Sequence, residues 1–471
     1  MHQARTFLTI LLALSFIAGP AITQDRGAEL EQVFQPPRPV ASTGYGGNVV
    51  SSGSWLAVFS FGETGPRAPQ TFPRGAVHLY RWTGQSWTFA HSIWSPVTAV
   101  GQVNSDGLSF GRGIAFAGSS LFVSDPNQRT MGDLRGAVHR YELVGERWQW
   151  REELTSPTNE PGRFGWSMAA HGDRLFVGAP TAAPTATTLP GAVHVLESSA
   201  QAGWAVVDTL RVESSITPAD SIAVSLAATE DQVVVSLDPS RHGVAVFSRG
   251  LGGWALSQLI EVRPTVPVPS NFGSSFSCDG DTLVIGDERV LFGGIREYVD
   301  VYRRGASGWE FHQTIESRLE PGTEFGGTVS VLGRRIVVGA RNALAPGGAF
   351  QSGRVIDYWR GASGQWVERG ELSAGRLDQV DPAGTFGTFV QVLGASVAAT
   401  DEIRALDGVT PGGALALFRV PVGERACAPQ PSSPGAPGEM ALAGPLDLLV
   451  LVARCDVSGV PPSAVTMVHV G

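Results

Sequence analysis

The sequence predicts an all-β protein, a seven-bladed β-propeller made of four-stranded antiparallel blades. Two observations carry this prediction. A unit of about 50 to 65 residues recurs seven times along the chain, a period typical of one propeller blade with its loops. Within each unit, period-2 runs rich in β-branched and aromatic residues alternate with glycine turns. The 471 residues include 59 Gly and 31 Pro, enough to separate many short strands.

Each unit opens with an aromatic residue followed by glycine, or with a degenerate equivalent. The seven pairs are Tyr45-Gly46, Phe110-Gly111, Phe164-Gly165, Ile222-Ala223, Phe272-Gly273, Phe325-Gly326 and Phe386-Gly387. An alternating strand, a tight turn and a second, apolar strand such as 175–178 follow each pair. A third strand begins at a glycine, as in 75–80, and a fourth begins with tryptophan. The tryptophans are Trp87, Trp148, Trp204, Trp254, Trp309 and Trp366. Each unit therefore predicts a four-stranded meander.

Seven openings but only six tryptophan strands leave one blade a strand short. After residues 413–420 the chain becomes Pro-rich, and no Trp strand follows. The N-terminal segment 29–36 is similar to the fourth-strand segment 151–157. Pairing residues 29–34 beside 413–420 would complete blade seven and remove the exposed edges of an open array. We therefore expect one ring-shaped domain over residues 28–427.

The third unit shows the repeat most fully, with FGWSM at 164–168, VGAP at 177–180 and GAV at 191–193. In this pattern the units resemble FG-GAP repeats, the blades of the integrin α-subunit propeller and of many secreted bacterial proteins. The resemblance covers about residues 28–422 and is strongest in units two, three, five and six, whereas unit four is degenerate and unit seven has lost the second glycine. It implies an integrin α-like repeat protein that serves cell adhesion or protein binding.

In calcium-binding members of that family, a loop of Asp-x-Asp-x-Asp-Gly type between the first and second strands supplies the oxygen ligands. The corresponding turns of this chain are short: Gly172-Asp173, Glu230-Asp231, Asp279-Gly280-Asp281, Gly333-Arg334 and Gly394-Ala395. One or two carboxylates cannot supply the six to eight oxygens that Ca²⁺ takes. We expect tight hairpin turns here, no cofactor, and folding that needs no calcium.

Composition and missing motifs exclude several functions. Every basic residue is arginine, so Schiff-base chemistry, lysine general bases and the Gly-Lys-Ser/Thr phosphate loop are excluded. The formal net charge of −9 and the absence of basic runs argue against nucleic-acid binding. The sequence has no Gly-x-Ser-x-Gly elbow, no His-Glu-x-x-His motif and no paired cysteine ligands. We therefore expect a protein that is not an enzyme.

The two ends of the chain predict its compartment. Residues 1–23 have the pattern of a secretory signal peptide, because Arg5 precedes an apolar stretch, 7–18, that ends too early for a membrane span. We expect secretion or export to the cell surface or periplasm, with no membrane span in the mature chain. Residues 428–445 form a Pro-rich linker and 446–471 a short tail. The apolar run of the tail, 446–453, predicts either a packed strand or an anchoring or sorting signal. Cys427 and Cys455 could form a disulfide, whereas Cys278 is expected to be inert.

Three histidines, His78, His139 and His194, occupy the same place in the third strands of units one to three. Equivalent positions in successive blades lie well apart, whereas a shared ion needs bonds of about 2.1 Å. Packing between blades is therefore favoured over metal ligation. The tryptophans that begin the fourth strands are likewise expected to cover blade edges, with carbohydrate stacking as the alternative.

Strand parity predicts which face binds a ligand. The first-to-second and third-to-fourth turns of a blade emerge on one face, here called the short-turn face. The second-to-third loops and the links between blades emerge on the other, here called the loop rim. The loop rim has the long, variable segments 59–74, 125–135, 180–190, 288–297, 341–352 and 401–412. Because rigid scaffolds display recognition on variable loops, we expect the binding surface on the loop rim.

Charged residues at the ends of the second strands are the candidate binding residues. They are Asp125, Arg129, Asp287, Arg289, Arg341, Asp401 and Arg404, and ordinary charge on solvated loops is the alternative. Charge changes at the three aspartates are expected to alter binding with little effect on stability. The expected function is a secreted, monomeric, non-enzymatic propeller that binds an extracellular protein or glycan. The alternative is a propeller enzyme that acts on an extracellular polysaccharide with Asp and Arg at the mouth of the axis.

Overall fold

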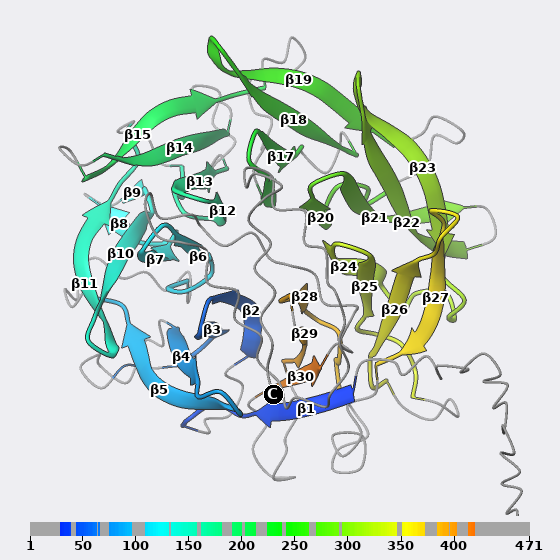
Figure 1. Ribbon diagram of the computed structural model, residues 1–471, viewed down its shortest axis with the longest axis horizontal. Helices are drawn as coiled ribbons and strands as arrows, with labels where there is room; N and C mark the ends of the chain where they lie inside the picture. The colour runs from blue at the N-terminus through cyan, green and yellow to red at the C-terminus, as the bar shows by residue number, and fades with distance from the viewer. Residues whose placement is uncertain are drawn as a thin grey trace, which may run out of the picture.

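The computed structural model describes residues 29–38, 44–63, 65, 75–96, 109–130, 133–157, 162–180, 191–199, 203–212, 224–237, 242–262, 270–291, 294–345, 351–372, 384–394, 396–402 and 413–419. They form seven four-stranded antiparallel sheets arranged in a ring (Figure 1). The predicted seven-bladed β-propeller is confirmed. The predicted signal peptide, linker, tail and disulfide lie outside the described residues, as does the degenerate pair Ile222-Ala223.

Each of the first six blades takes four strands in chain order, and from blade 1 to blade 7 the first strands of successive blades contact one another around the axis. Blade 1 has β2 (Tyr45–Ser52), β3 (Trp55–Ser60), β4 (Ala76–Trp82) and β5 (Trp87–Trp94); blade 2 has β6 (Ile114–Ala117), β7 (Ser120–Asp125), β10 (Ala137–Val144) and β11 (Arg147–Leu154); blade 3 has β12 (Ser167–His171), β13 (Arg174–Ala179), β14 (Ala192–Ser199) and β15 (Gly203–Leu210). A small hairpin, β8 (Arg129–Thr130) and β9 (Asp133–Leu134), extends from blade 2.

The second half of the ring continues this plan. Blade 4 has β16 (Leu226–Ala228), β17 (Gln232–Ser236), β18 (Gly243–Gly250) and β19 (Gly253–Glu261); blade 5 has β20 (Phe276–Asp279), β21 (Thr282–Leu291), β22 (Gly294–Gly305) and β23 (Gly308–Glu316); blade 6 has β24 (Phe325–Leu332), β25 (Arg335–Ala340), β26 (Arg354–Arg360) and β27 (Trp366–Glu371). Blade 7 combines β28 (Val390–Val392), β29 (Ser396–Asp401) and β30 (Ala414–Arg419) with β1 (Glu29–Phe34).

The strand β1 closes the ring as predicted. It pairs antiparallel with β30, so that Glu29 lies opposite Arg419 and Phe34 opposite Leu415. The Glu31 carboxylate accepts hydrogen bonds from the Ser396 hydroxyl and from the Arg419 guanidinium, each at 3.2 Å. Strands from the two ends of the ring therefore share one sheet (Figure 1).

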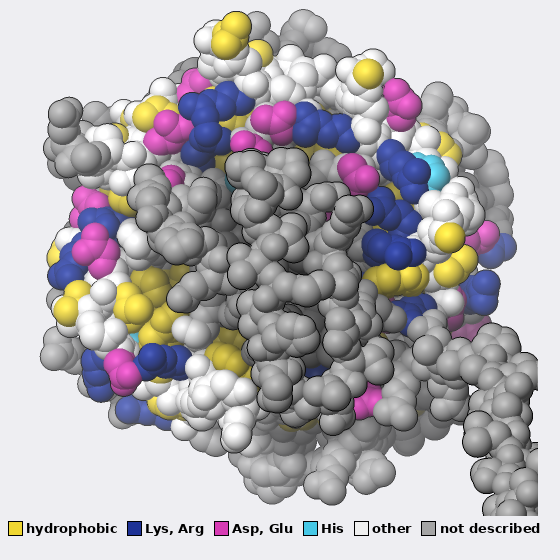
Figure 2. All heavy atoms as spheres, in the orientation of Figure 1, with side chains coloured by type: hydrophobic (Ala, Val, Ile, Leu, Met, Phe, Trp, Pro, Cys, Tyr) yellow, Lys and Arg dark blue, Asp and Glu magenta, His cyan; other side chains and the backbone are white. Residues whose placement is uncertain are grey.

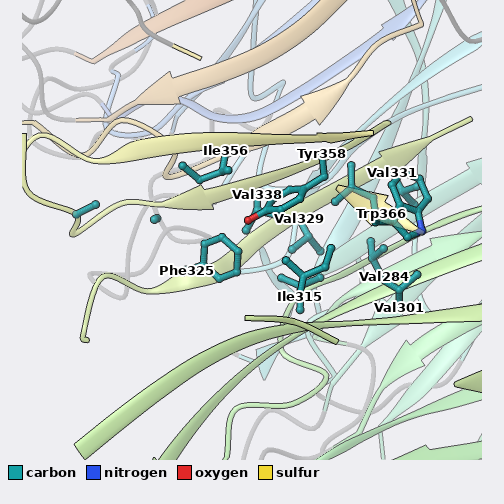
Figure 3. Packing of buried hydrophobic residues seen from close by; sticks show 14 residues of the cluster. Val284, Val301, Ile315, Phe325, Val329, Val331, Val338, Ile356, Tyr358 and Trp366 are labelled. Carbon is teal, nitrogen blue, oxygen red and sulfur yellow. The ribbon is translucent and has the colours of Figure 1, made fainter. Parts of the chain in front are cut away.

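The apolar core is divided among the spaces between blades. Among the described residues there are seven clusters of buried apolar side chains, and each joins two neighbouring blades. Figure 3 shows the cluster between blades 5 and 6, in which Val284 and Val301 of blade 5 lie beside Val331 and Trp366 of blade 6. The second strands β3, β7 and β25 are buried at every residue because a blade covers each side. No blade could bury its apolar faces alone.

A repeated polar contact joins the outer edges of the blades. Every outer strand contains a register shift at the same place in its pairing with the third strand. In three of them a glutamine follows the bulge and binds the backbone of the tryptophan that begins the next blade's outer strand. These pairs are Gln32 with Trp87, Gln258 with Trp309 and Gln313 with Trp366. The Gln313 amide donates to the Trp366 carbonyl at 2.9 Å and accepts from its N–H at 2.8 Å.

Two expectations about loops have different outcomes. The short turns are tight hairpins, with φ of 58° at Gly172 and 51° at Gly280, which confirms the prediction. The expected long loop 288–297 is wrong, because β21 and β22 continue outward as a paired hairpin as far as Leu291 and Gly294. Alternating side chains let this segment extend the sheet instead of leaving it. Among the described residues, no helix is long and apolar enough to cross a membrane.

The glutamine contacts yield a stability prediction. Gln313→Ala leaves the backbone N–H and carbonyl of Trp366 without their partners, so we expect a loss of about 1–3 kcal/mol in the free energy of unfolding. Urea unfolding monitored by tryptophan fluorescence measures it. The control is Gln365→Ala, because Gln365 is exposed and its side chain makes no such contact. Equal stability of the two variants would contradict the interblade role.

Candidate functional site

Charged side chains on the short-turn face pair between neighbouring blades. The pairs include Arg81–Glu146, Arg249–Glu197, Arg304–Asp231 and Arg360–Asp281. Arg304 of blade 5 reaches back to blade 4, where its Nη1 donates to Asp231 Oδ1 at 2.9 Å. Figure 2 shows arginine and carboxylate side chains close together around the ring. These four pairs therefore join neighbouring blades, and each contributes little to stability because it is largely exposed.

On the loop rim, a cavity of about 390 Å³ lies between blades 5, 6 and 7. Its lining comes from residues that flank the aromatic-Gly pairs and from the ends of the second strands. Asn271, Ser274 and Thr388 supply amide and hydroxyl groups, and Asp287 and Arg341 are the two predicted binding residues that line it. The cavity thus lies on the face that strand parity indicated.

Close backbone contact sets the walls of this cavity. A Cβ atom built on Gly286 would lie 2.1 Å from the carbonyl oxygen of Gly326 in the next blade, and one on Gly339 would lie 2.2 Å from that of Gly387. Any side chain at Gly286 or Gly339 would push the blades apart. Gly326 and Gly387 themselves have φ near 90° (87° and 90°), which favours glycine. Neighbouring blades therefore meet backbone to backbone where the cavity begins.

Carboxylates dominate the charge of the cavity. Glu324, at φ 57°, is bound by Arg341, whose Nε donates at 2.5 Å and Nη2 at 3.0 Å, and by the Asn342 amide at 2.8 Å. Burial, and then the charge of Glu324, raises the pKa of Glu288. Burial also raises the pKa of nearby Glu402, although Arg341 opposes the shift. Arg341 pairs with Glu324 and Arg289 with Asp287, whereas Glu288 has no arginine partner among the described residues, so the cavity can accept hydrogen bonds or bind positive charge.

The three predicted aspartates do not meet in one pocket. Each lies in its own blade and accepts a hydrogen bond from a Ser or Thr hydroxyl near that blade's aromatic-Gly pair. The pairs are Asp125 with Ser109 at 2.6 Å, Asp287 with Ser270 at 2.6 Å and Asp401 with Thr385 at 3.1 Å. The aspartates are 8%, 2% and 0% exposed. This contact joins the end of the second strand to the start of the blade. The burial of the aspartates does not agree with the expectation that charge changes at these positions have little effect on stability.

The predicted arginines have different surroundings. Arg289 points inward, where its Nε donates to Asp287 at 2.5 Å and its Nη2 lies 3.7 Å from Asp300. Arg129 lies in β8 opposite Leu134. Of the three predicted arginines that the structure describes, only Arg341 lines the cavity, where it binds Glu324. Arg404, Cys427 and Cys455 lie outside the described residues, and the binding role of the whole set stays a prediction.

Sequence reasoning missed Glu288, Glu324, Ser274 and Thr388. Three of these four flank an aromatic-Gly pair: Glu324 directly precedes Phe325, and Ser274 and Thr388 directly follow their glycines. Since the pairs repeat around the axis, positions beside them form a ring at its mouth. Comparing residues at this repeat position would have found them.

The histidine series packs as a structural element. His78, His139 and His194 are 1%, 0% and 1% exposed, and each ring lies against the aromatic residue that opens its blade. His194 Nδ1 is 3.0 Å from the Thr209 hydroxyl. Among the described residues, no three His, Cys, Asp or Glu side chains are grouped so that they could hold a metal ion. Calcium independence of folding stays a prediction.

Comparisons with known proteins identify no family for this chain. No family model matches the chain, and no curated protein does either. Of 455 matching chains of solved structures, one belongs to a structure described as "Crystal Structure of Mitotic Checkpoint Complex". It shares 12% identity with this chain, with a TM-score of 0.49, and the match covers 88% of this chain and 99% of that one.

The buried aspartates yield a second stability prediction. Asp287→Ala removes the carboxylate that accepts hydrogen bonds from Arg289 and Ser270. Among the described residues it leaves only Asp300, 3.7 Å from Arg289, so we expect a loss of about 1–3 kcal/mol in the free energy of unfolding. Chemical unfolding of the parent and the variant measures it. Asp173→Ala, in an exposed short turn, is the control and should change stability by less than about 0.5 kcal/mol. If Asp287→Ala is as stable as the control, the contacts of Asp287 do not stabilise the fold.

A pH prediction follows from His139. Burial lowers its pKa from 6.5 to about 4. The native state therefore resists protonation, whereas the unfolded chain binds a proton below about pH 6.5. The contribution of His139 to stability is complete above that pH and is lost progressively as the pH drops towards 4. Between pH 7 and pH 5, we expect the free energy of unfolding of His139→Leu to fall by about 2 kcal/mol less than that of the parent. Urea unfolding at the two pH values tests this, and an equal loss in both proteins would refute it.

Proposed function

We propose that the chain is a secreted, non-enzymatic FG-GAP propeller that binds an extracellular protein or glycan through its loop rim. The proposal depends on the cavity between blades 5, 6 and 7, because it combines a hollow of ligand size with polar groups that converge on it. The separation of tasks between the two faces supports it further. Charges of the short-turn face pair between blades, whereas Ser274 and Glu288 on the loop rim are open to a ligand.

The chemistry of the lining supports binding over catalysis. Its described side chains offer hydroxyl, amide and carboxylate groups and the guanidinium of Arg341, and they include no histidine or cysteine. Such groups recognise hydroxyls, amides and cationic groups by hydrogen bonds, and a rigid scaffold holds them without reorganisation. Backbone contact at Gly286 and Gly326 fixes the spacing of the walls. A preformed site of this kind supports recognition of an extended ligand that lies across three blades.

One observation favours the alternative, an enzyme acting on an extracellular polysaccharide. Glu288 and Glu324 line one cavity, and the pKa of Glu288 is raised by burial and by the charge of Glu324. A carboxyl with a raised pKa beside an ionised one is the arrangement of a general acid and its partner in glycoside hydrolysis. Arg341 and Asn342, however, bind both oxygens of Glu324, which suits a structural carboxylate better.

The experiment is a binding screen of the purified full chain against glycan arrays and extracellular-matrix proteins. Ser274→Trp fills the cavity from an exposed position and should weaken binding about tenfold or more, or about 1.4 kcal/mol. Ser307→Trp places the same side chain on the short-turn face and should bind like the parent. Loss of binding in Ser307→Trp alone would contradict the loop rim as the recognition face. Polysaccharide turnover that disappears in Glu288→Gln would favour the enzyme instead.

A further inference from the structure

A second polar feature lies across the axis from the cavity, at the start of blades 2 and 3. Arg112 directly follows the pair Phe110-Gly111, and Trp166 directly follows Phe164-Gly165. This is the repeat position that Ser274 and Thr388 occupy in the cavity. The loop rim therefore carries small polar residues on one side of the mouth and two large, hydrogen-bond-donating residues on the other.

Arg112, Trp166 and Arg163 form a compact group, here called the arginine bracket. The guanidinium carbon of Arg112 lies 3.9 Å from the centroid of the Trp166 ring, and that of Arg163 lies 5.1 Å from it. Backbone contacts position the group: the Asn48 amide donates to the Arg112 carbonyl at 3.0 Å, and the Trp166 N–H donates to the Arg163 carbonyl at 3.0 Å. Arg163 has a φ of 51°, a backbone conformation that arginine rarely adopts.

The bracket has donors but no acceptor among the described residues. No carboxylate, carbonyl or hydroxyl group there pairs with either guanidinium, and Arg163 Nε and Trp166 Nε1 are buried without a hydrogen-bond partner. The Arg112 side chain itself is exposed. Two like charges placed together without a counter-ion among the described residues destabilise the fold, and so does each buried donor that has no partner. Elsewhere on this protein, arginines such as Arg304 and Arg341 are paired with carboxylates.

We propose that the arginine bracket binds an oxyanion, the sulfate or carboxylate group of an acidic ligand. This inference deepens the proposed function, on which it rests for the choice of the loop rim. The exposed guanidinium of Arg112 can donate two parallel hydrogen bonds to such a group, and the positive charge of Arg163 beside it adds attraction. Because Arg112 covers the Trp166 ring, the indole is not free to stack on a sugar from that side. Recognition is therefore by charge and hydrogen bonding.

The first experiment uses inorganic sulfate as the probe. Thermal unfolding of the full chain is compared in sulfate and in chloride of equal ionic strength, at about 1–20 mM, where general salt effects are small. We expect a saturating rise of about 2 °C in sulfate, because sulfate binds only the native state. Arg112→Gln and Arg163→Asn should abolish the rise, and Asn tolerates the positive φ at residue 163. Arg318→Gln, which removes an arginine that is 82% exposed, should keep it.

The second experiment identifies the source of the oxyanion. Heparin and polyglutamate are titrated into the parent and the same variants, and the bracket variants should weaken binding of one of them at least about tenfold. Superimposable transitions in sulfate and chloride, or an equal sulfate response in Arg112→Gln, would overturn the inference. In that case Ser274→Trp still decides the proposed function, because the cavity and the bracket are tested by separate variants.

Discussion

Burial of apolar side chains between neighbouring blades is the interaction on which this structure depends. Each cluster takes its residues from two blades, as Val284 and Trp366 show for blades 5 and 6. A blade released from one neighbour would expose half of its apolar surface to water, and burial of that surface is the main favourable term in folding. Stability is therefore a property of the closed ring. The contribution of β1 extends beyond blade 7, because Val33 and Phe34 shield the apolar clusters on both sides of blade 7 from water.

The sequence predicts the features that repeat and misses those that depend on two distant segments. The aromatic-Gly pairs and the tryptophan strands appear in nearly every unit, so even the missing seventh Trp was informative, and it located the closing strand at residues 29–34. The pairing of Asp287 with Ser270 is different, because the serine stands 17 positions earlier in a loop that pattern reasoning treats as solvated. The cavity could not be predicted from the sequence either, because its lining comes from three blades that are far apart along the chain. Strand parity nevertheless indicated its face.

The mouth of the axis is divided by charge. On the side of blades 5, 6 and 7, Glu288 and Glu324 face a hollow that one arginine only partly neutralises. On the side of blades 2 and 3, Arg112 and Arg163 share an indole. The formal net charge of −9 does not predict this division, because it does not depend on where the charged residues lie in the structure. A ligand with charges of both signs would find both partners on one rim, and its orientation would be fixed by the field across the mouth.

The antiparallel seam has a mechanical consequence. Because Glu29 lies opposite Arg419, the chain enters and leaves the ring at the same end of one strand pair. Tension applied between those two points would load the hydrogen bonds of β1 and β30 one after another, as in a zipper, instead of all together in shear. The ring is therefore mechanically weakest when its two ends are pulled apart.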